Sequence, residues 1–240
     1  MDYHENWAWV NNISKLEYQD DMLILAGDIS NLTVLLKKVF QTLVKSFKKV
    51  FYVPGNHDLW TIKNGNSDSL ARFETLLKLA KDCGICTTPM IKKEIAIIPL
   101  FAWYDYSFAD FSDELSHCWR DFTACKWPPG YDEKRITHFF LSLNEPLPIL
   151  KNTYTISFSH FLPRIDLMPD YIPLEKQKIY PVLGTSLLER QIRQLGSKIH
   201  IYGHSHVNMQ VKKNDIWYIN NAFGYPNELH FTRKCLRCIY

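Results

Sequence analysis

Four short motifs in this chain carry side chains that can bind metal ions or transfer protons, and each directly follows a run of apolar residues. The motifs are Gly27-Asp28, Gly55-Asn56-His57-Asp58, Ser159-His160 and Gly203-His204-Ser205-His206. Carboxylate, amide and imidazole groups together form a ligand set suited to divalent metal ions. Any one motif alone could be an ordinary turn, because Gly, Asn and Asp are common turn residues. Four unrelated turns would not share this chemistry, so the set predicts a metal site.

The apolar runs before the motifs have the length and composition of buried β-strands. They cover residues 22–25, 50–53, 154–158 and 199–202. Short aliphatic, β-branched and aromatic runs bounded by Gly or Pro are typical of such strands. Open α/β sheets gather their functional sites at the carboxyl ends of the strands. We therefore expect the four motifs to meet at one edge of the fold.

Helical periodicity separates these strands. Residues 32–47 repeat apolar side chains on one helix face between the first two strands, which predicts a parallel β-α-β unit. Further helices are expected at about residues 67–81, 133–143 and 186–195, and a further strand at 95–101. The segment 107–148 is rich in charge, Trp and Pro, and we expect loops there around that one helix at 133–143.

The last third of the chain changes to antiparallel structure. Residues 207–211 and 216–219 flank Lys212-Lys213-Asn214-Asp215, and the Asn-Asp pair tolerates the positive φ of a hairpin turn. Parallel units early and a hairpin late predict a mixed α/β fold, in which two mixed β-sheets pack together with helices outside. No repeat or linker divides the chain, so we expect one domain over residues 1–240.

Composition and charge exclude several classes of protein. The net charge is only +3, with basic and acidic residues interspersed, so there is no nucleic-acid footprint. No apolar stretch is long enough to span a bilayer, and the first residues lack the pattern of a secretory signal. We therefore expect a cytoplasmic protein that does not bind membranes. The sequence specifies no oligomeric state.

The cysteines offer a rival interpretation. Cys83-Gly-Ile-Cys86 and Cys235-Leu-Arg-Cys238 are two C-x-x-C pairs, which are typical of structural zinc sites. The pairs stand far apart in the chain, whereas zinc ribbons and fingers usually join theirs over roughly 12–20 residues. Ordinary reduced cysteines are the favoured interpretation.

Together the four motifs resemble those of the calcineurin-like metallophosphoesterases. Leu25-Ala-Gly-Asp28, Val53-Pro-Gly-Asn-His-Asp58, Ser159-His160 and Tyr202-Gly-His-Ser-His206 are similar to the motifs of that family. The resemblance implies a four-layer αββα sandwich and hydrolysis of a phosphoester by water activated at two divalent metal ions, such as Mn, Fe or Zn.

The resemblance also implies roles for individual residues. Asp28 would bridge the two metals, Asn56, His160 and His204 would complete the second metal, and His206 would bind the first. His57 would act on the phosphate, with Asp58 holding its ring. Arg164, four residues beyond His160, could contact a phosphate oxygen, although a solvated surface arginine is the alternative.

One family motif has no counterpart in its usual place. Family members open with a strand ending in Asp-x-His, which supplies further ligands to the first metal, and Met1 stands just after that position. Asp2-Tyr3-His4 imitates the motif without a preceding strand. The first metal is therefore expected to be weak or absent. Two functions stay open: a metal-dependent phosphatase or phosphodiesterase, and a non-catalytic scaffold or binding module that retains one metal.

Overall fold

The two apolar runs nearest the N-terminus form a parallel pair of strands, β1 (Met22–Leu25) and β2 (Lys49–Tyr52). α2 (Thr33–Leu43) connects them, so the predicted β-α-β unit is confirmed, although the helix ends before the expected residue 47. The protein is described by a computed structural model that covers residues 8–13, 16–62, 68–228, 232 and 234–240. α3 (Ser69–Asp82) follows, with the Asp68 side chain accepting a hydrogen bond from the Ala71 N–H at its N-terminus.

The remaining strands form a six-stranded mixed sheet in the order β3-β4-β5-β6-β8-β7. Its central strands run parallel, and β3 and β7 pair antiparallel at the two edges. The strands are β3 (Met90–Ile91), β4 (Ile95–Pro99), β5 (Tyr154–Phe158), β6 (Ile199–Tyr202), β7 (Met209–Lys213) and β8 (Ile216–Asn220). The predicted hairpin is therefore the β7–β8 pair, with positive φ at both Asn214 and Asp215.

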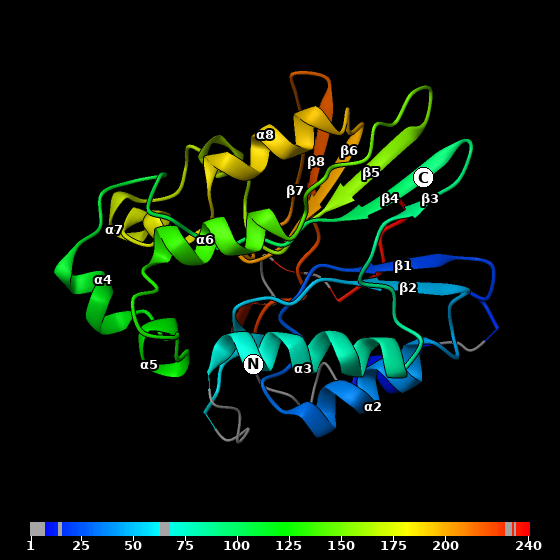
Figure 1. The fold of residues 1–240 in the computed structure, drawn as a ribbon, viewed down its shortest axis with the longest axis horizontal. Coiled ribbons are helices and arrows are strands. Elements are labelled where there is room, and N and C mark those ends of the chain that lie inside the picture. Colours follow the sequence, from blue (N-terminus) through cyan, green and yellow to red (C-terminus); the bar gives the residue numbers. More distant parts are fainter. Residues whose placement is uncertain (1–7, 14–15, 63–67, 229–231, 233) are drawn as a thin grey trace.

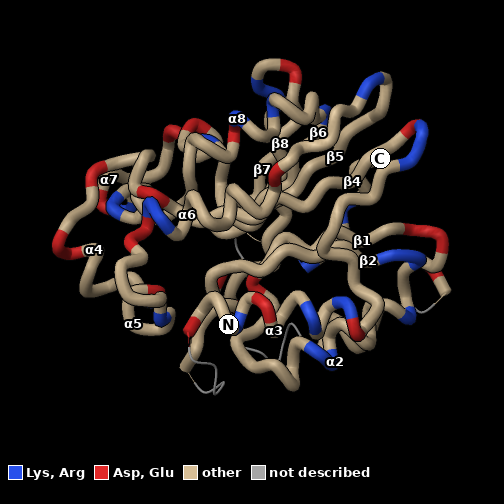
Figure 2. The backbone as a smooth tube through the Cα atoms, in the orientation of Figure 1, with Lys and Arg blue, Asp and Glu red and all other residues tan. Residues whose placement is uncertain are grey.

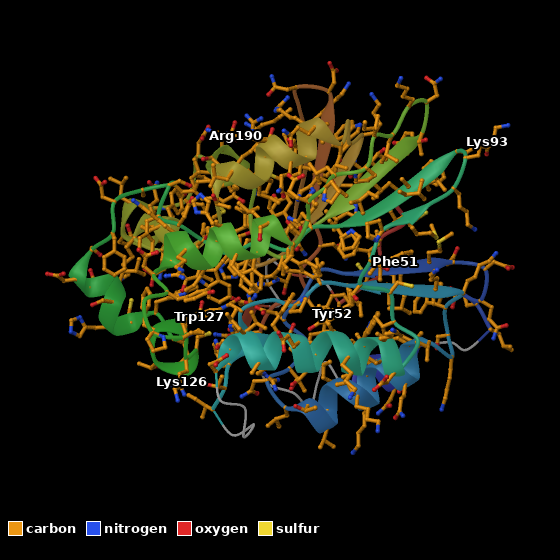
Figure 3. All side chains as sticks on the ribbon, in the orientation of Figure 1. Phe51, Tyr52, Lys93, Lys126, Trp127 and Arg190 are labelled. Carbon is orange, nitrogen blue, oxygen red and sulfur yellow. The ribbon has the colours of Figure 1, made fainter. Side chains whose placement is uncertain are left out.

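The layers stack as helices, sheet, sheet and helices (Figure 1). α6 (Glu133–Ser142) and α8 (Ser186–Gln194) cover the six-stranded sheet, whereas α2 and α3 cover the β1–β2 pair. Side chains of β2 alternate between the two faces: Phe51 packs between the sheets and Tyr52 packs against the helices (Figure 3). The αββα sandwich is confirmed, but the described part of the smaller sheet is a parallel pair and not a mixed sheet.

The segment that the sequence left mainly as loops contains two additional short helices. These are α4 (Asp113–Cys118) and α5 (Asp121–Ala124), and both lie near α7 (Leu174–Gln177) at one end of the sandwich (Figure 1). The described part of the chain also contains four short 3-10 helices: η1 (His57–Leu59), η2 (Ile165–Leu167), η3 (Tyr180–Val182) and η4 (Pro226–Glu228). Trp103 and Tyr104, just before this segment, are buried in the core, where they pack on Phe161.

Charged residues of both signs are interspersed along the chain, as Figure 2 shows. Within the described residues, no helix is both long and apolar enough to cross a membrane.

Candidate metal centre

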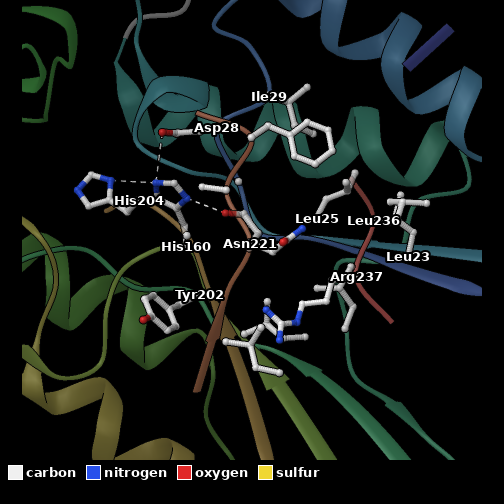
Figure 4. A pocket seen from close by; sticks show the side chains of 18 of the residues that line it. Leu23, Leu25, Asp28, Ile29, His160, Tyr202, His204, Asn221, Leu236 and Arg237 are labelled. Atoms are coloured by element: carbon white, nitrogen blue, oxygen red, sulfur yellow. Dashed lines mark hydrogen bonds and ion pairs between the residues drawn. The ribbon is translucent and has the colours of Figure 1, made fainter. Parts of the chain in front are cut away.

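Four ligand-type atoms converge where β1, β2, β5 and β6 end. His160 Nε2 lies 3.4 Å from Asp28 Oδ2, 3.1 Å from His204 Nδ1 and 3.0 Å from Asn56 Oδ1. Figure 4 shows Asp28, His160 and His204 directed toward one another. In the part of the chain that is described, Asp28, His160 and His204 are the group of acidic, His or Cys side chains that could hold an ion.

The hydrogen bonds behind the two imidazoles determine which nitrogen faces the cluster as an electron-pair donor. His160 Nδ1 lies 2.7 Å from the carbonyl oxygen of Ala26, and His204 Nε2 lies 3.0 Å from that of Val182. Because a carbonyl only accepts, each of these nitrogens carries the proton of its ring. In the neutral form of each ring, His160 Nε2 and His204 Nδ1 are then unprotonated, which is how second-shell hydrogen bonds prepare metal-ligating histidines.

The Asn56 side chain is oriented in the same way. Its Nδ2 donates to both carboxylate oxygens of Asp121, at 2.9 and 3.1 Å, which leaves Oδ1 facing His160. With both rings neutral, the cluster brings unprotonated donors together with no proton between them. Such an arrangement is repulsive by itself and fits a divalent cation bound at its centre.

The charges of the cluster agree with this chemistry. Burial alone would raise the pKa of Asp28, but the imidazoles of His160 and His57 lower it, to about 2. Burial lowers the pKa of His204 well below its ordinary value, and the neighbouring His160 lowers it further. The site thus combines an ionised Asp28 carboxylate with a neutral His204 imidazole, the protonation states that a metal requires of these two groups.

The backbone reaches these positions through close approaches and unusual dihedral angles. A Cβ atom at Gly27 would lie 2.5 Å from His160 Nδ1, so only glycine allows β1 to end against that ring. Asp28, His204 and His206 have positive φ values of 57°, 66° and 54°. Non-glycine residues rarely adopt this region, and such strain concentrates at functional sites.

Asp58 stabilises the backbone beside the cluster and does not hold the His57 ring as expected. Its carboxylate accepts hydrogen bonds from the N–H groups of Asp28, Ile29, Ser30 and Gly55 and from the Tyr52 hydroxyl. His57 and Asp58 are consecutive residues of the 3-10 helix η1, where neighbouring side chains point about 120° apart. The predicted Asp58–His57 contact is therefore wrong, and Asp58 fixes the loop that carries Asp28.

His57 lies at the margin of the cluster. Its ring stacks on Trp60 with 3.9 Å between centroids, and its Nε2 is 3.9 Å from Asp28 Oδ2 and 3.4 Å from the Tyr225 hydroxyl. The His57 backbone N–H also donates to Asp28 Oδ1 at 2.9 Å. The imidazole is thus close to the candidate metal site without being one of its convergent donors.

His206 is not part of the convergent group. Its Nδ1 lies 2.8 Å from Glu228 Oε2, and its ring packs edge-on against Tyr225. It nevertheless lines the same cavity as Asp28, His160 and His204. Asp2 and His4, the possible substitutes for the Asp-x-His motif, lie outside the described residues.

Comparison with known proteins identifies the family. The sequence profile of the calcineurin-like phosphoesterases matches residues 2–208. The chain belongs to this family. One curated relative, the [acyl-carrier-protein] phosphodiesterase PptH of Mycobacterium tuberculosis, is 36% identical over 101 residues, which are 37% of this chain and only 30% of the relative. The crystal structure of the phosphopantetheinyl hydrolase PptH from the same organism superposes with a TM-score of 0.70 at 22% identity, covering 90% of this chain and 84% of that chain.

The donors of Arg164 are bound by side chains outside the convergent group of this phosphoesterase. Its guanidinium contacts Asp166 at 2.8 and 2.9 Å, Glu189 at 3.2 Å and Asn214 at 3.1 Å. The hydrogen bonds to Asp166 raise the pKa of Arg164 still further above its ordinary value. These contacts weigh against a role for Arg164 in binding phosphate, because nearby side chains already bind its donors, and that role stays a prediction.

The two C-x-x-C pairs do not form a second metal site. All four cysteines are described, and none belongs to a group that could hold an ion. They are free thiols, in agreement with the favoured interpretation of the sequence.

A cavity of about 300 Å³ opens beside the cluster of this phosphoesterase (Figure 4). Its walls are mostly apolar and come from β1, α2 and the C-terminal segment, including Leu25, Val39 and Leu236. Among the described residues, β1 pairs with β2 alone, and the cavity extends along β1 as far as Asp28.

Proposed function

We propose that this chain is a metal-dependent phosphodiesterase whose divalent ion is bound by Asp28, Asn56, His160 and His204. The convergence of Asp28 Oδ2, Asn56 Oδ1 and His204 Nδ1 on His160 Nε2 is the observation that supports the proposal. A divalent ion bound there would act as a Lewis acid toward a phosphoryl oxygen and lower the pKa of a water molecule.

The chain's own groups divide the remaining work. Asp28 supplies negative charge to the ion, and its Oδ1 is held by the His57 N–H. His57 presents an imidazole at the margin of the site, fixed by stacking on Trp60. We assign it the role of stabilising negative charge on the phosphate or of giving a proton to the leaving oxygen. Asp58 fixes the loop that carries Asp28 by accepting hydrogen bonds from its backbone N–H groups.

Two observations favour a diester over a monoester substrate. The similar PptH protein is named as an acyl-carrier-protein phosphodiesterase. Among the described residues, the side-chain contacts of Asp28, Asn56, His57, His160 and His204 include no Lys or Arg. A monoanionic diester requires less positive charge than a dianionic monoester. A phosphodiester to a carrier protein is the substrate class that we propose.

We further propose one tightly bound ion and a second, weaker one near His206. The tight ion would have four protein donors, whereas Asp28 and His206 alone would leave a second ion mostly to water. The bond between His206 and Glu228 favours the same order of affinity. This order of affinity is also compatible with the non-catalytic alternative, because a scaffold that retains one metal would have the same complete site.

The experiment combines metal titration with hydrolysis. Protein freed of metal by chelation is titrated with Mn²⁺ in a calorimeter and then assayed with bis(p-nitrophenyl) phosphate and p-nitrophenyl phosphate. We expect one tight class of sites and faster hydrolysis of the diester. His57→Ala should keep the tight ion and lose roughly 10²–10⁴-fold in turnover, the range for a general acid–base group.

The matched control is His138→Ala, because His138 is an exposed histidine on α6 with a hydrogen bond to its own helix. It should retain both metal binding and turnover. If His57→Ala hydrolyses the diester as fast as the parent, the role given to His57 is wrong. A parent protein that binds the ion tightly and hydrolyses neither ester would support the scaffold function instead.

A further inference from the structure

We infer that Asp121 is the positioning residue of the metal centre, through which Asn56, His57 and His204 are held in place together. The inference rests on the proposed function and adds to it a residue from outside the four motifs. Asp121 is the first residue of α5, in the Trp-rich segment between β4 and β5.

The Asp121 carboxylate is buried and accepts hydrogen bonds from four side chains. Oδ1 accepts from Asn56 Nδ2 at 2.9 Å and from Trp60 Nε1 at 2.7 Å. Oδ2 accepts from Asn56 Nδ2 at 3.1 Å, Trp119 Nε1 at 2.8 Å and the Tyr104 hydroxyl at 3.3 Å. The residue is 2% exposed, so these donors replace the water that a carboxylate would otherwise bind.

The first connection runs through Asn56. An amide can present either its oxygen or its nitrogen to the cluster, and the carboxylate of Asp121 binds only the nitrogen. Asp121 therefore fixes Asn56 Oδ1 toward His160 Nε2, at 3.0 Å. Without that partner the amide could rotate and place donor hydrogens where a cation must bind.

The other two connections run through the indoles. Trp60, bound to Oδ1, is stacked on His57 with rings 24° apart. Trp119, bound to Oδ2, meets the ring of His204 edge-on at a centroid distance of 5.7 Å. One carboxylate thus orients a metal ligand directly and supports the two imidazoles through the aromatic rings beside them.

Asp121→Asn tests the inference with little change in shape. An amide has one acceptor oxygen, so whichever way it lies, its N–H₂ group faces an indole N–H and one of the tryptophans loses its acceptor. We expect Mn²⁺ affinity, measured by calorimetry, to fall roughly 10–100-fold, as for other second-shell substitutions. Tryptophan fluorescence of the metal-free protein should change as well.

The double variant with Asn56→Ala shows whether Asp121 acts through the ligand. If it does, Asp121→Asn should weaken Mn²⁺ binding much less in the Asn56→Ala background than in the parent, because coupled residues are not additive. Independent, additive losses would overturn the connection through Asn56. Parent-like Mn²⁺ affinity in Asp121→Asn alone would overturn the inference as a whole.

A control separates positioning from general destabilisation. Asp132→Ala removes the hydrogen bond that the Asp132 side chain accepts from the Arg135 N–H at the start of α6, away from the centre. It should lower the melting temperature and leave Mn²⁺ affinity unchanged. If Asp121→Asn does not fold, Trp119→Phe replaces it: we expect a severalfold loss of affinity, and parent-like affinity would contradict the inference.

The same set distinguishes this inference from the proposed function. Asn56→Ala should itself weaken Mn²⁺ binding if the metal centre is correctly placed. If Asn56→Ala binds as the parent does, the metal centre is wrong. If Asn56→Ala weakens binding and Asp121→Asn does not, only the role of Asp121 fails.

Discussion

His204 and His206 stand two residues apart, both at positive φ, yet they occupy different environments. The outer nitrogen of His204 is bound by a backbone carbonyl, and its other nitrogen lies in the convergent cluster. His206 is bound at Nδ1 by the Glu228 carboxylate and stands outside that cluster. The group that binds the outer nitrogen of an imidazole and the position of the ring therefore decide its role, and spacing along the chain does not.

The largest expected effect separates these two histidines directly. His204→Ala removes one of four donors and should weaken the tight Mn²⁺ class by more than the roughly 100-fold of a strong second-shell substitution. His206→Ala should change that class less than about tenfold, with its effect confined to any weaker binding. Calorimetric titration of both variants measures the difference. Equal losses would show that His206 is a ligand of the tight ion.

A second prediction concerns the support beneath His160. The hydroxyl of neighbouring Ser159 donates a hydrogen bond to the Phe161 carbonyl and accepts one from the Nε2–H of buried His200. The Ser157 hydroxyl donates a hydrogen bond to His200 Nδ1. Burial lowers the pKa of His200 from 6.5 to about 3. Between pH 6.5 and pH 3, His200 is protonated in the unfolded chain but neutral in the folded protein. It therefore does not lower the free energy of unfolding above pH 6.5, and it lowers that free energy increasingly as the pH falls toward 3.

The magnitude can be checked in metal-free protein. Two pH units below 6.5, the loss of stability through His200 should be about 2.7 kcal/mol, at 1.36 kcal/mol per unit. Urea unfolding at pH 7 and pH 4.5 should show this extra loss in the parent relative to His200→Gln. If both proteins lose the same free energy of unfolding between the two pH values, His200 is not the buried neutral group described above.

The smallest expected effect concerns Arg164, which lies outside the surroundings of both His204 and His206. Arg164→Ala removes contacts with Asp166 and Glu189 from a side chain that is 21% exposed, so the loss of stability should be about 1 kcal/mol or less. Turnover of the diester should stay within about twofold of the parent, because the donors of Arg164 are already bound by Asp166, Glu189 and Asn214. Steady-state kinetics and thermal melting measure the two effects. A large rise in KM would indicate that Arg164 contacts the substrate.

The elements that position the site could be predicted from the sequence because their apolar patterns are local. The runs before Asp28 and His160 are strands β1 and β5, and α3 begins and ends within two residues of its expected bounds. Since parallel strands bring their carboxyl ends together, the convergence of Asp28, His160 and His204 could be predicted from the positions of these strands. That all 240 residues form one domain stays a prediction.

The supporting contacts could not be predicted in the same way. Asp121 lies in a segment without periodicity, and its partners Asn56, Trp60 and Tyr104 are 17 to 65 residues away in the chain. Asp58 was expected to serve its neighbour His57, but the 3-10 geometry turns the two side chains apart. Such partners depend on tertiary packing, which leaves no pattern in a single sequence.

The cluster also has a mechanical consequence. Asp28 and Asn56 follow strands of the small sheet, whereas His160 and His204 follow strands of the large one. An ion bound by all four residues would cross-link the two sheets. The ionic radius that the site binds best would then depend on the distance between the sheets. Phe51 and Phe158 lie in the core between the sheets, with ring centroids 6.4 Å apart. Selectivity among divalent metals could therefore be changed by repacking this core, without altering any ligand.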